Sequence, residues 1–459
     1  MAMPGTVVRP SALCLPSLSE PRWSLGFLGL LLYLFVEYTS LPDMYPVLSP
    51  LHTGKIVVGI ALLGYLLAPR SRAALAKDAG FIDTAMLLLV FSVSVSTLFN
   101  AGRQGIWSGL SDVLKWIVIY FLVSRILASR WRLRGFLFLL FLLNLKLAQF
   151  AVRSYISGRE AGFSGMEIIK LGGASGGSTA FFGNAADFGL AMCVVWGLAW
   201  ALFFRKGNRL FWQLFLAVCF FGFLLAILVS GSRGAVVGAA AIVLAAIIRT
   251  PKKTGAILLL MLFVASLLFV LPGANKTRFQ HALHWRQDKD AYSRIMLWKA
   301  GLHMWADHPM FGVGPYEFGH VFVASPLYVS WSPYGTAAHA AHSLYIEAIA
   351  ELGSAGTLLL LTSVLIFFRL NAKTRAWALA HDRDGRRSWD YCLAAGLDLA
   401  MVGYLVSGAF LAVLYYPHLW ILLGLGVASH RVCCVAQPSE QPVLPRRGLQ
   451  AKRPVTAAL

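Results

Sequence analysis

The stretch that decides the fold is AAHSLYIEAIAELG, residues 340–353, where a long polar segment gives way to apolar residues. The apolar run continues to Phe368 without a basic side chain, which at ~1.5 Å per residue is long enough to cross the ~30 Å of hydrocarbon in a bilayer. His342 therefore stands at the mouth of a predicted membrane-spanning helix. An ionisable ring at that boundary is a candidate site residue, and the simpler alternative is an interfacial histidine that only begins the helix.

The composition indicates an integral membrane protein. The chain has 459 residues, of which 58% are apolar and 13% charged, and it contains 14 tryptophans; a water-soluble core does not need so much apolar surface. The net charge of +20 does not indicate nucleic acid, because the basic residues lie almost wholly between hydrophobic runs. None of the six cysteines falls in a long polar loop, so no disulfide framework or thiolate metal site is predicted.

Twelve hydrophobic runs are long enough to span a bilayer, or nearly so. We therefore predict an all-α integral membrane protein with about 12 transmembrane helices and one long outer loop. The runs cover residues 24–41, 55–69, 80–98, 107–128, 134–152, 185–204, 210–230, 234–250, 254–272, 342–368, 391–414 and 418–436.

The basic residues predict the orientation of these helices. If the N-terminus is cytoplasmic, most of the 40 lysines and arginines fall in cytoplasmic segments, as the positive-inside rule requires. Both termini are therefore expected in the cytoplasm and His342 on the periplasmic side. The predicted organisation is a cytoplasmic tail (1–23), nine spans (24–272), a long periplasmic loop (273–341), three further spans (342–436) and a basic cytoplasmic tail (437–459).

The long loop is too aromatic for disorder and is long enough for structure of its own. Within it, Tyr292–Ala306 places apolar residues at helical spacing and predicts an amphipathic helix at the outer membrane interface. Arg294 lies on this helix. The following Pro309–Gly314 segment, PMFGVG, predicts a tight turn that its glycines permit.

Two arginines are candidate phosphate ligands. Arg233 follows Ser230, Gly231 and Ser232 at the outer end of the eighth run, and a guanidinium beside serine hydroxyls and helix N-terminal amides suits a phosphate. Arg294 offers the same donors near the membrane plane. The alternatives are an arginine that snorkels to lipid headgroups for Arg233 and a solvated surface arginine for Arg294.

Other ionisable residues receive weaker assignments. Glu347 and Glu351 share one helix face, with a structural partner role favoured for Glu351. Asp187, near the outer end of the sixth run, is a possible site or pairing group. The histidines of the long loop match no compact ligand motif, so no metal is assigned; they are His281, His284, His303, His308, His320 and His339.

Five motifs follow one another in a fixed order along the chain. They are Ser232-Arg233-Gly234, Ser293-Arg294-Ile295 with Trp298, the Pro309–Gly314 segment, Ala341-His342-Ser343 and Glu351-Leu352-Gly353. This ordered set resembles the O-antigen ligase and O-antigen polymerase superfamily of bacterial envelope glycosyltransferases. Ser343 stands where that family commonly has asparagine, which is similar to ligase-like members associated with exosortase and exopolysaccharide loci.

The resemblance implies a GT-C-like, metal-independent enzyme without a cofactor in the bacterial inner membrane. It would move a glycan from undecaprenyl diphosphate to an acceptor hydroxyl, of lipid A-core or similar, on the periplasmic face. His342 would be the catalytic base and Arg233 and Arg294 the diphosphate ligands, with Ser232, Glu347 and Asp187 in possible supporting roles. The expected partners are the lipid-linked donor, the lipid or glycan acceptor and membrane lipids, and no nucleic acid.

Other functions remain open at this stage. A polymerase would use a second lipid-linked repeat as acceptor, and a protein O-oligosaccharyltransferase would use a protein. A polysaccharide flippase or transporter belongs to another class and would suit twelve spans. Charges at mid-membrane would favour transport, whereas the polar groups here gather at the predicted outer face.

Overall fold

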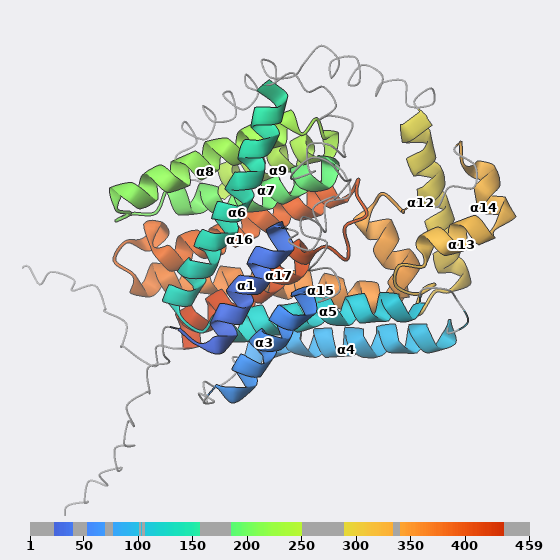
Figure 1. Cartoon of the computed structure of the whole chain (residues 1–459), viewed down its shortest axis with the longest axis horizontal. Coiled ribbons are helices and arrows are strands. Elements are labelled where there is room, and N and C mark those ends of the chain that lie inside the picture. Colours follow the sequence, from blue (N-terminus) through green and yellow to red (C-terminus); the bar gives the residue numbers. More distant parts are fainter. Residues whose placement is uncertain are drawn as a thin grey trace, which may run out of the picture.

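The computed structural model describes residues 23–39, 53–68, 77–100, 102, 106–156, 185–249, 289–333 and 340–435. Every regular element in these residues is a helix (Figure 1). The all-α prediction is therefore confirmed for the described part of the chain. The helices are α1 (Leu25–Thr39), α3 (Thr53–Leu67), α4 (Lys77–Phe99), α5 (Ile106–Ile126), α6 (Arg130–Ile156), α7 (Ala185–Phe203), α8 (Leu210–Val229), α9 (Arg233–Arg249), α12 (Lys289–Asp307), α13 (Phe318–Ala324), α14 (Pro326–Trp331), α15 (Leu344–His381), α16 (Trp389–Gly408) and α17 (Pro417–His430), with short turns η4 (Gly385–Arg387) and η5 (Arg431–Val435).

Seven of these helices are long and apolar enough to cross a membrane, which makes the described part a multi-pass bundle. They are α4, α5, α6, α7, α8, α15 and α16. The helices α1 and α3 are apolar but have only 15 residues each, α9 has 17, and α17, which begins at a proline, has 14. The predicted total of about twelve spans is thus not reached in these residues, and the run at 254–272 lies outside them.

The centre of the bundle is α7, of which 83% of the membrane-length window is buried inside the protein. It packs against α8, α9 and α16. Small residues allow the close approach: a Cβ on Gly197 would lie 2.7 Å from the backbone nitrogen of Ala400 on α16. The backbones of α7 and α16 are therefore in direct contact, which fixes the position of the two ends of α16.

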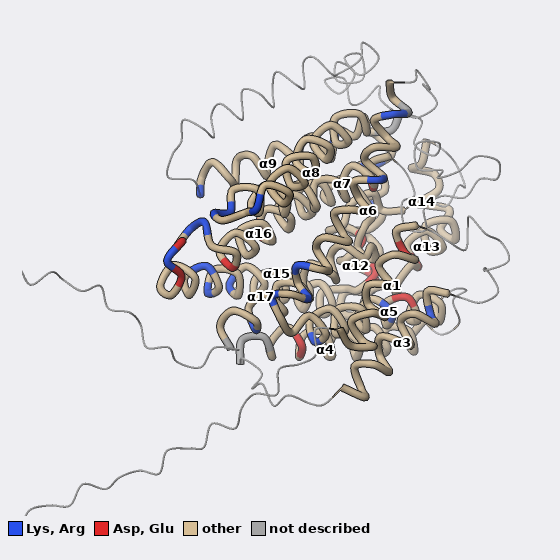
Figure 2. The backbone as a smooth tube through the Cα atoms, turned by 60° about the vertical axis from the view of Figure 1, so that its left-hand side comes forward, with Lys and Arg blue, Asp and Glu red and all other residues tan. Residues whose placement is uncertain are grey.

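One end of the bundle is rich in lysine and arginine, around η4 and the neighbouring ends of α8, α9 and α15 (Figure 2). We call it the basic end. Asp398 of α16 is completely buried there and pairs with Arg249 of α9 at 3.1 Å and with Arg375 of α15. Nearby, Asp390 pairs with Arg130 at 2.5 Å. The assignment of this end to the cytoplasm remains a prediction.

Residues 289–333 form a helical lobe at the opposite end (Figure 1). Its helices α12, α13 and α14 share a small apolar core that includes Leu297, Phe318, Phe322 and Tyr328 and reaches Ala350 of α15. The segment predicted as an amphipathic helix lies within α12. The division of the chain into tails, spans and periplasmic loop remains a prediction.

Candidate functional site

His342 lies immediately before α15, in left-handed backbone with a φ of 46°. It is half-buried, and Ser343 after it is extended and begins the helix. Left-handed backbone is uncommon outside glycine and concentrates at functional sites, where the surrounding structure holds it. The residue predicted as the base therefore has a fixed and partly accessible position, while its catalytic role remains a prediction.

The helix that follows His342 is interrupted at Gly353, whose φ is 63°. The sequence predicts one continuous helix here, but the Pro309–Gly314 turn fills the interruption. Backbone groups that the interruption frees are paired with the turn, as buried backbone requires. Four bonds are made: Val313 N–H to Ala350 O (2.9 Å), Gly314 N–H to Glu351 O (3.0 Å), Ser354 N–H to Pro309 O (2.9 Å) and Ala355 N–H to Met310 O (3.0 Å).

Two glycines make this pairing sterically possible. Gly312 and Gly353 both have positive φ, and a Cβ on either would lie 2.5 Å from backbone atoms of the other segment. The α12 helix joins the same assembly, because Trp305 donates from Nε1 to Ser354 Oγ at 2.9 Å. The helical lobe is therefore locked to α15 through backbone contacts that no larger residue could preserve.

Glu351 is the side chain that organises the next layer. It is 3% exposed, and its carboxylate accepts hydrogen bonds from the N–H groups of Tyr316 at 2.8 Å and Phe318 at 3.0 Å. It also accepts one from the Tyr415 hydroxyl at 2.7 Å. One buried carboxylate thus joins α15, the segment before α13 and the connection between α16 and α17, and the structural partner role favoured from the sequence agrees with these contacts.

The connection between α16 and α17, residues 409–416, is held along its length; we call it the strap. Its contacts come from four different helices, so its conformation depends on the whole bundle. The bonds are Arg294 Nη1 to Phe410 O (3.2 Å), Tyr404 Oη to Val413 O (2.5 Å), Leu414 N–H to Glu347 Oε2 (3.0 Å), Tyr415 Oη to Glu351 Oε2 (2.7 Å) and Tyr416 Oη to Asp187 Oδ2 (2.6 Å).

Both predicted phosphate ligands lie beside the strap. Arg294 donates to Phe410 O. Arg233 is the first residue of α9, and a Cβ on the adjacent Gly234 would lie 3.5 Å from Ser407 O and 3.6 Å from Phe410 Cβ. Helices α9 and α12, which are separated in the sequence, therefore bring their arginines to the same turn at the end of α16.

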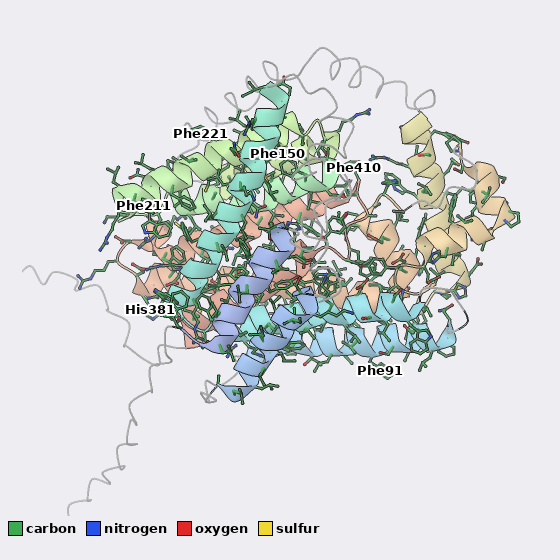
Figure 3. All side chains as sticks on the ribbon, in the orientation of Figure 1. Phe91, Phe150, Phe211, Phe221, His381 and Phe410 are labelled. Carbon is green, nitrogen blue, oxygen red and sulfur yellow. The ribbon has the colours of Figure 1, made fainter. Side chains whose placement is uncertain are left out.

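The start of α15 reaches that turn as well. A Cβ on Gly408 would lie 3.2 Å from Leu344 Cδ2, and Leu344 is two residues after His342. Phe410 marks the place, at the end of α16 that faces α12, far from His381 at the basic end (Figure 3). The structure thus brings the neighbourhoods of Arg233, Arg294 and His342 together.

The three supporting residues are all engaged in structure. Glu347 is buried and anchors the strap at Leu414, and Asp187 is buried and anchors it at Tyr416. Ser232 accepts from the N–H of Ala235 through Oγ at 3.2 Å, so it caps the first turn of α9. Each therefore positions a part of the site, and a direct role in chemistry remains a prediction.

Two features of the site are not predicted from the sequence: the strap, and the hydrogen-bonded contact between the Pro309–Gly314 turn and α15 at Gly353. The predicted run at 391–414 includes most of the strap, because Phe410, Leu411 and Val413 are apolar. The sequence predicts the glycine-rich turn, but it does not show which backbone segment the turn will contact. Tyr415 and Tyr416, two polar aromatic rings at the end of an apolar run, were the available signal.

The described residues contain no group of three or more His, Cys, Asp or Glu placed to hold a metal ion. His281, His284 and His339 lie outside those residues. The assignment of no metal therefore remains a prediction.

Residues 217–361 match the family model described as O-antigen ligase. This match covers about a third of the chain and supports its similarity to the O-antigen ligase and polymerase superfamily. Among curated proteins, none matches the chain by sequence. The matched region contains Arg233, Arg294, His342 and the interruption of α15 at Gly353, whereas Asp187 and the strap lie outside it. A transferase of the membrane-bound ligase or polymerase type is the function that this superfamily indicates.

Proposed function

We propose that the protein transfers a glycan from undecaprenyl diphosphate to an acceptor hydroxyl on the periplasmic face of the inner membrane. The observation that carries this proposal is the meeting of three separate elements at the end of α16. Arg294 bonds to Phe410 O, Gly234 packs on the same turn, and Leu344 packs on Gly408. Two guanidiniums and an imidazole near one turn provide anion binding and proton transfer together.

In the proposed reaction, the imidazole of His342 accepts the proton of the acceptor hydroxyl. The hydroxyl oxygen bonds to the anomeric carbon of the donor sugar, and the bond from that carbon to the diphosphate oxygen breaks. The diphosphate leaves with the electron pair of that bond. Arg233 and Arg294 stabilise the charge that develops on it, so chemistry of this kind requires no metal or other cofactor.

The buried carboxylates have a positioning role in this scheme. Glu347 and Asp187 hold the strap, and the strap holds Arg294 through Phe410. Ser232 fixes the first turn of α9, on which Arg233 lies. Positioning matters because a displacement of about 1 Å at a catalytic group can cost about a hundredfold in rate.

The acceptor distinguishes a ligase from its relatives. We propose a lipid A-core or a similar glycolipid as the acceptor; transfer to a second lipid-linked repeat would define a polymerase, and transfer to protein an O-oligosaccharyltransferase. The purified protein would be given a labelled undecaprenyl-diphosphate glycan with each acceptor in turn. Labelled glycolipid is the expected product. Release of the carrier diphosphate with none of the three acceptors labelled would overturn the proposal, as would the absence of any turnover.

A further inference from the structure

Tyr316 shares an unusual backbone conformation with His342. Among the described residues, these two are the non-glycine residues with positive φ, 62° for Tyr316 and 46° for His342. Such a conformation is strained for a large side chain and persists where the surroundings impose it. Here the constraint is the hydrogen bond from Tyr316 N–H to Glu351 at 2.8 Å.

The ring of Tyr316 is stacked but accessible. It lies on the ring of Tyr415, with 4.2 Å between the centroids and 21° between the planes. Tyr415 is 5% exposed, whereas Tyr316 is 42% exposed. Tyr415 is in turn held by its bond to Glu351. A rigid, buried ring therefore supports a second ring that remains open to a ligand.

An acidic side chain lies beside this aromatic pair. Partial burial, together with the nearby Asp112, raises the pKa of Tyr316 above its usual value. The hydroxyl thus stays neutral, and Asp112 itself is exposed on α5. Helix α5 is packed tightly on this segment, since a Cβ on Gly109 would lie 2.3 Å from Pro315 O.

We propose that Tyr316, supported by Tyr415, is a platform on which a sugar ring of the substrate stacks, with Asp112 accepting a sugar hydroxyl. The C–H bonds on one face of a pyranose suit the negative face of an aromatic ring, and a carboxylate is a strong acceptor for hydroxyl groups. This inference rests on the proposed glycan transfer. Tyr415 and Asp112 both lie outside the region matched by the family model, so the platform would give this chain a sugar preference of its own.

The test separates sugar binding from carrier binding. Purified protein would be titrated with undecaprenyl diphosphate that carries the glycan and with undecaprenyl diphosphate alone. For Tyr316→Leu we expect about tenfold weaker binding of the glycan-bearing lipid, the scale of one lost aromatic contact, and unchanged binding of the bare carrier. Tyr316→Trp should bind both lipids as the natural protein does. Tyr65→Leu, at a tyrosine of α3 that is 40% exposed, is the matched control and should change neither.

The sugar ring that stacks on Tyr316 can belong to the donor or to the acceptor. If the platform holds the acceptor, Tyr316→Leu leaves both donor titrations unchanged and raises KM for the acceptor about tenfold, with kcat retained. Asp112→Asn, an exposed change that leaves the fold intact, should shift the same constant in the same direction. If Tyr316→Leu does not fold, Asp112→Asn alone tests whether the platform binds a sugar.

Two results would overturn the platform while leaving the proposed function intact. In the first, the natural protein transfers glycan, and Tyr316→Leu has the same donor affinity and the same acceptor KM as the natural protein. The other is an equal loss of binding for the glycan-bearing lipid and the bare carrier, which would make Tyr316 a purely structural residue. Absence of transfer and of carrier binding in the natural protein would instead contradict the proposed function itself.

Discussion

The two ends of the bundle hold their buried carboxylates in different ways. At the basic end, Asp398 and Asp390 are paired with guanidinium groups. At the site end, Glu347 and Glu351 accept from backbone N–H groups and a tyrosine hydroxyl. Ion pairs join helices at the first end, whereas neutral donors at the second fix the path of loops.

This difference suggests that the carboxylates at the basic end contribute mainly to stability and those at the site end mainly to the geometry of catalysis. A buried ion pair holds two helices but need not define a reaction geometry. A carboxylate that accepts two or three directed hydrogen bonds specifies where several backbone segments lie. We therefore expect substitutions at the basic end to change the amount of folded protein, and substitutions at the site end to change turnover per folded molecule.

The largest effect is expected at His342. His342→Ala and His342→Gln should fold and bind the lipid-linked donor, while transfer falls by roughly 10²–10⁴-fold, the range for a lost general base. The measurement is turnover per folded molecule, with a chelator present. His381→Ala, at an exposed histidine of the basic end, is the control and should retain full turnover. Full turnover by His342→Ala would remove this residue from the mechanism.

Glu351→Gln should have the next largest effect on turnover. The amide replaces one acceptor oxygen with a donor that faces the N–H groups of Tyr316 and Phe318 or the Tyr415 hydroxyl, so the loop and the strap must move. A displacement of about 1 Å predicts a loss of about a hundredfold in kcat. Donor affinity and kcat should be measured on monodisperse protein; an unchanged kcat would show that the strap does not position the site.

The arginines should respond to a change that preserves their charge. Arg233→Lys and Arg294→Lys should each weaken binding of undecaprenyl diphosphate by about tenfold, because a point charge cannot reproduce the two-pronged contact of a guanidinium. Arg209→Lys, at an exposed arginine just before α8, serves as control. Carrier binding at the natural level in both site variants would leave these arginines as headgroup anchors.

Asp398→Asn tests the opposite end. Loss of this charge leaves Arg249 and Arg375, which are both half-buried, without their buried partner, which should lower the free energy of unfolding by about 1–3 kcal/mol. Thermal unfolding in detergent would detect the change as a lower Tm. The molecules that remain folded should transfer glycan at the normal rate, and a selective loss of kcat would contradict the separation of the two ends.

Single cysteine substitutions are expected to have the smallest effect on activity. They also test the orientation of the protein in the membrane. In a chain whose native cysteines are replaced, Met310→Cys in the turn and Leu379→Cys near the basic end are both exposed positions. An impermeant maleimide added from the periplasm should label the first and not the second. Labelling of position 379 and not of position 310 would show that the orientation in the membrane is opposite to the one proposed.

The sequence could supply the helices because their information is local. Apolar length and small residues predict membrane helices, and eleven of the twelve predicted runs coincide with described helices. Apolar length also misplaced boundaries: the run at 391–414 includes most of the strap, since burial inside a protein and burial in lipid favour the same side chains. Likewise, the sequence predicts a continuous helix through Gly353, because a single glycine is compatible with a helix unless another segment packs into the interruption.

For the site, residue types and order in the sequence were sufficient to select Arg233, Arg294 and His342 as candidates. Their convergence was a matter of tertiary structure, since it depends on α9, α12 and α15 meeting the end of α16. The same holds for Glu351, Tyr316 and Tyr415, which are separated along the chain and are joined by one carboxylate. Side-chain chemistry is written in the sequence, whereas the partner of a hydrogen bond is decided by packing, because long-range contacts depend on every helix between them.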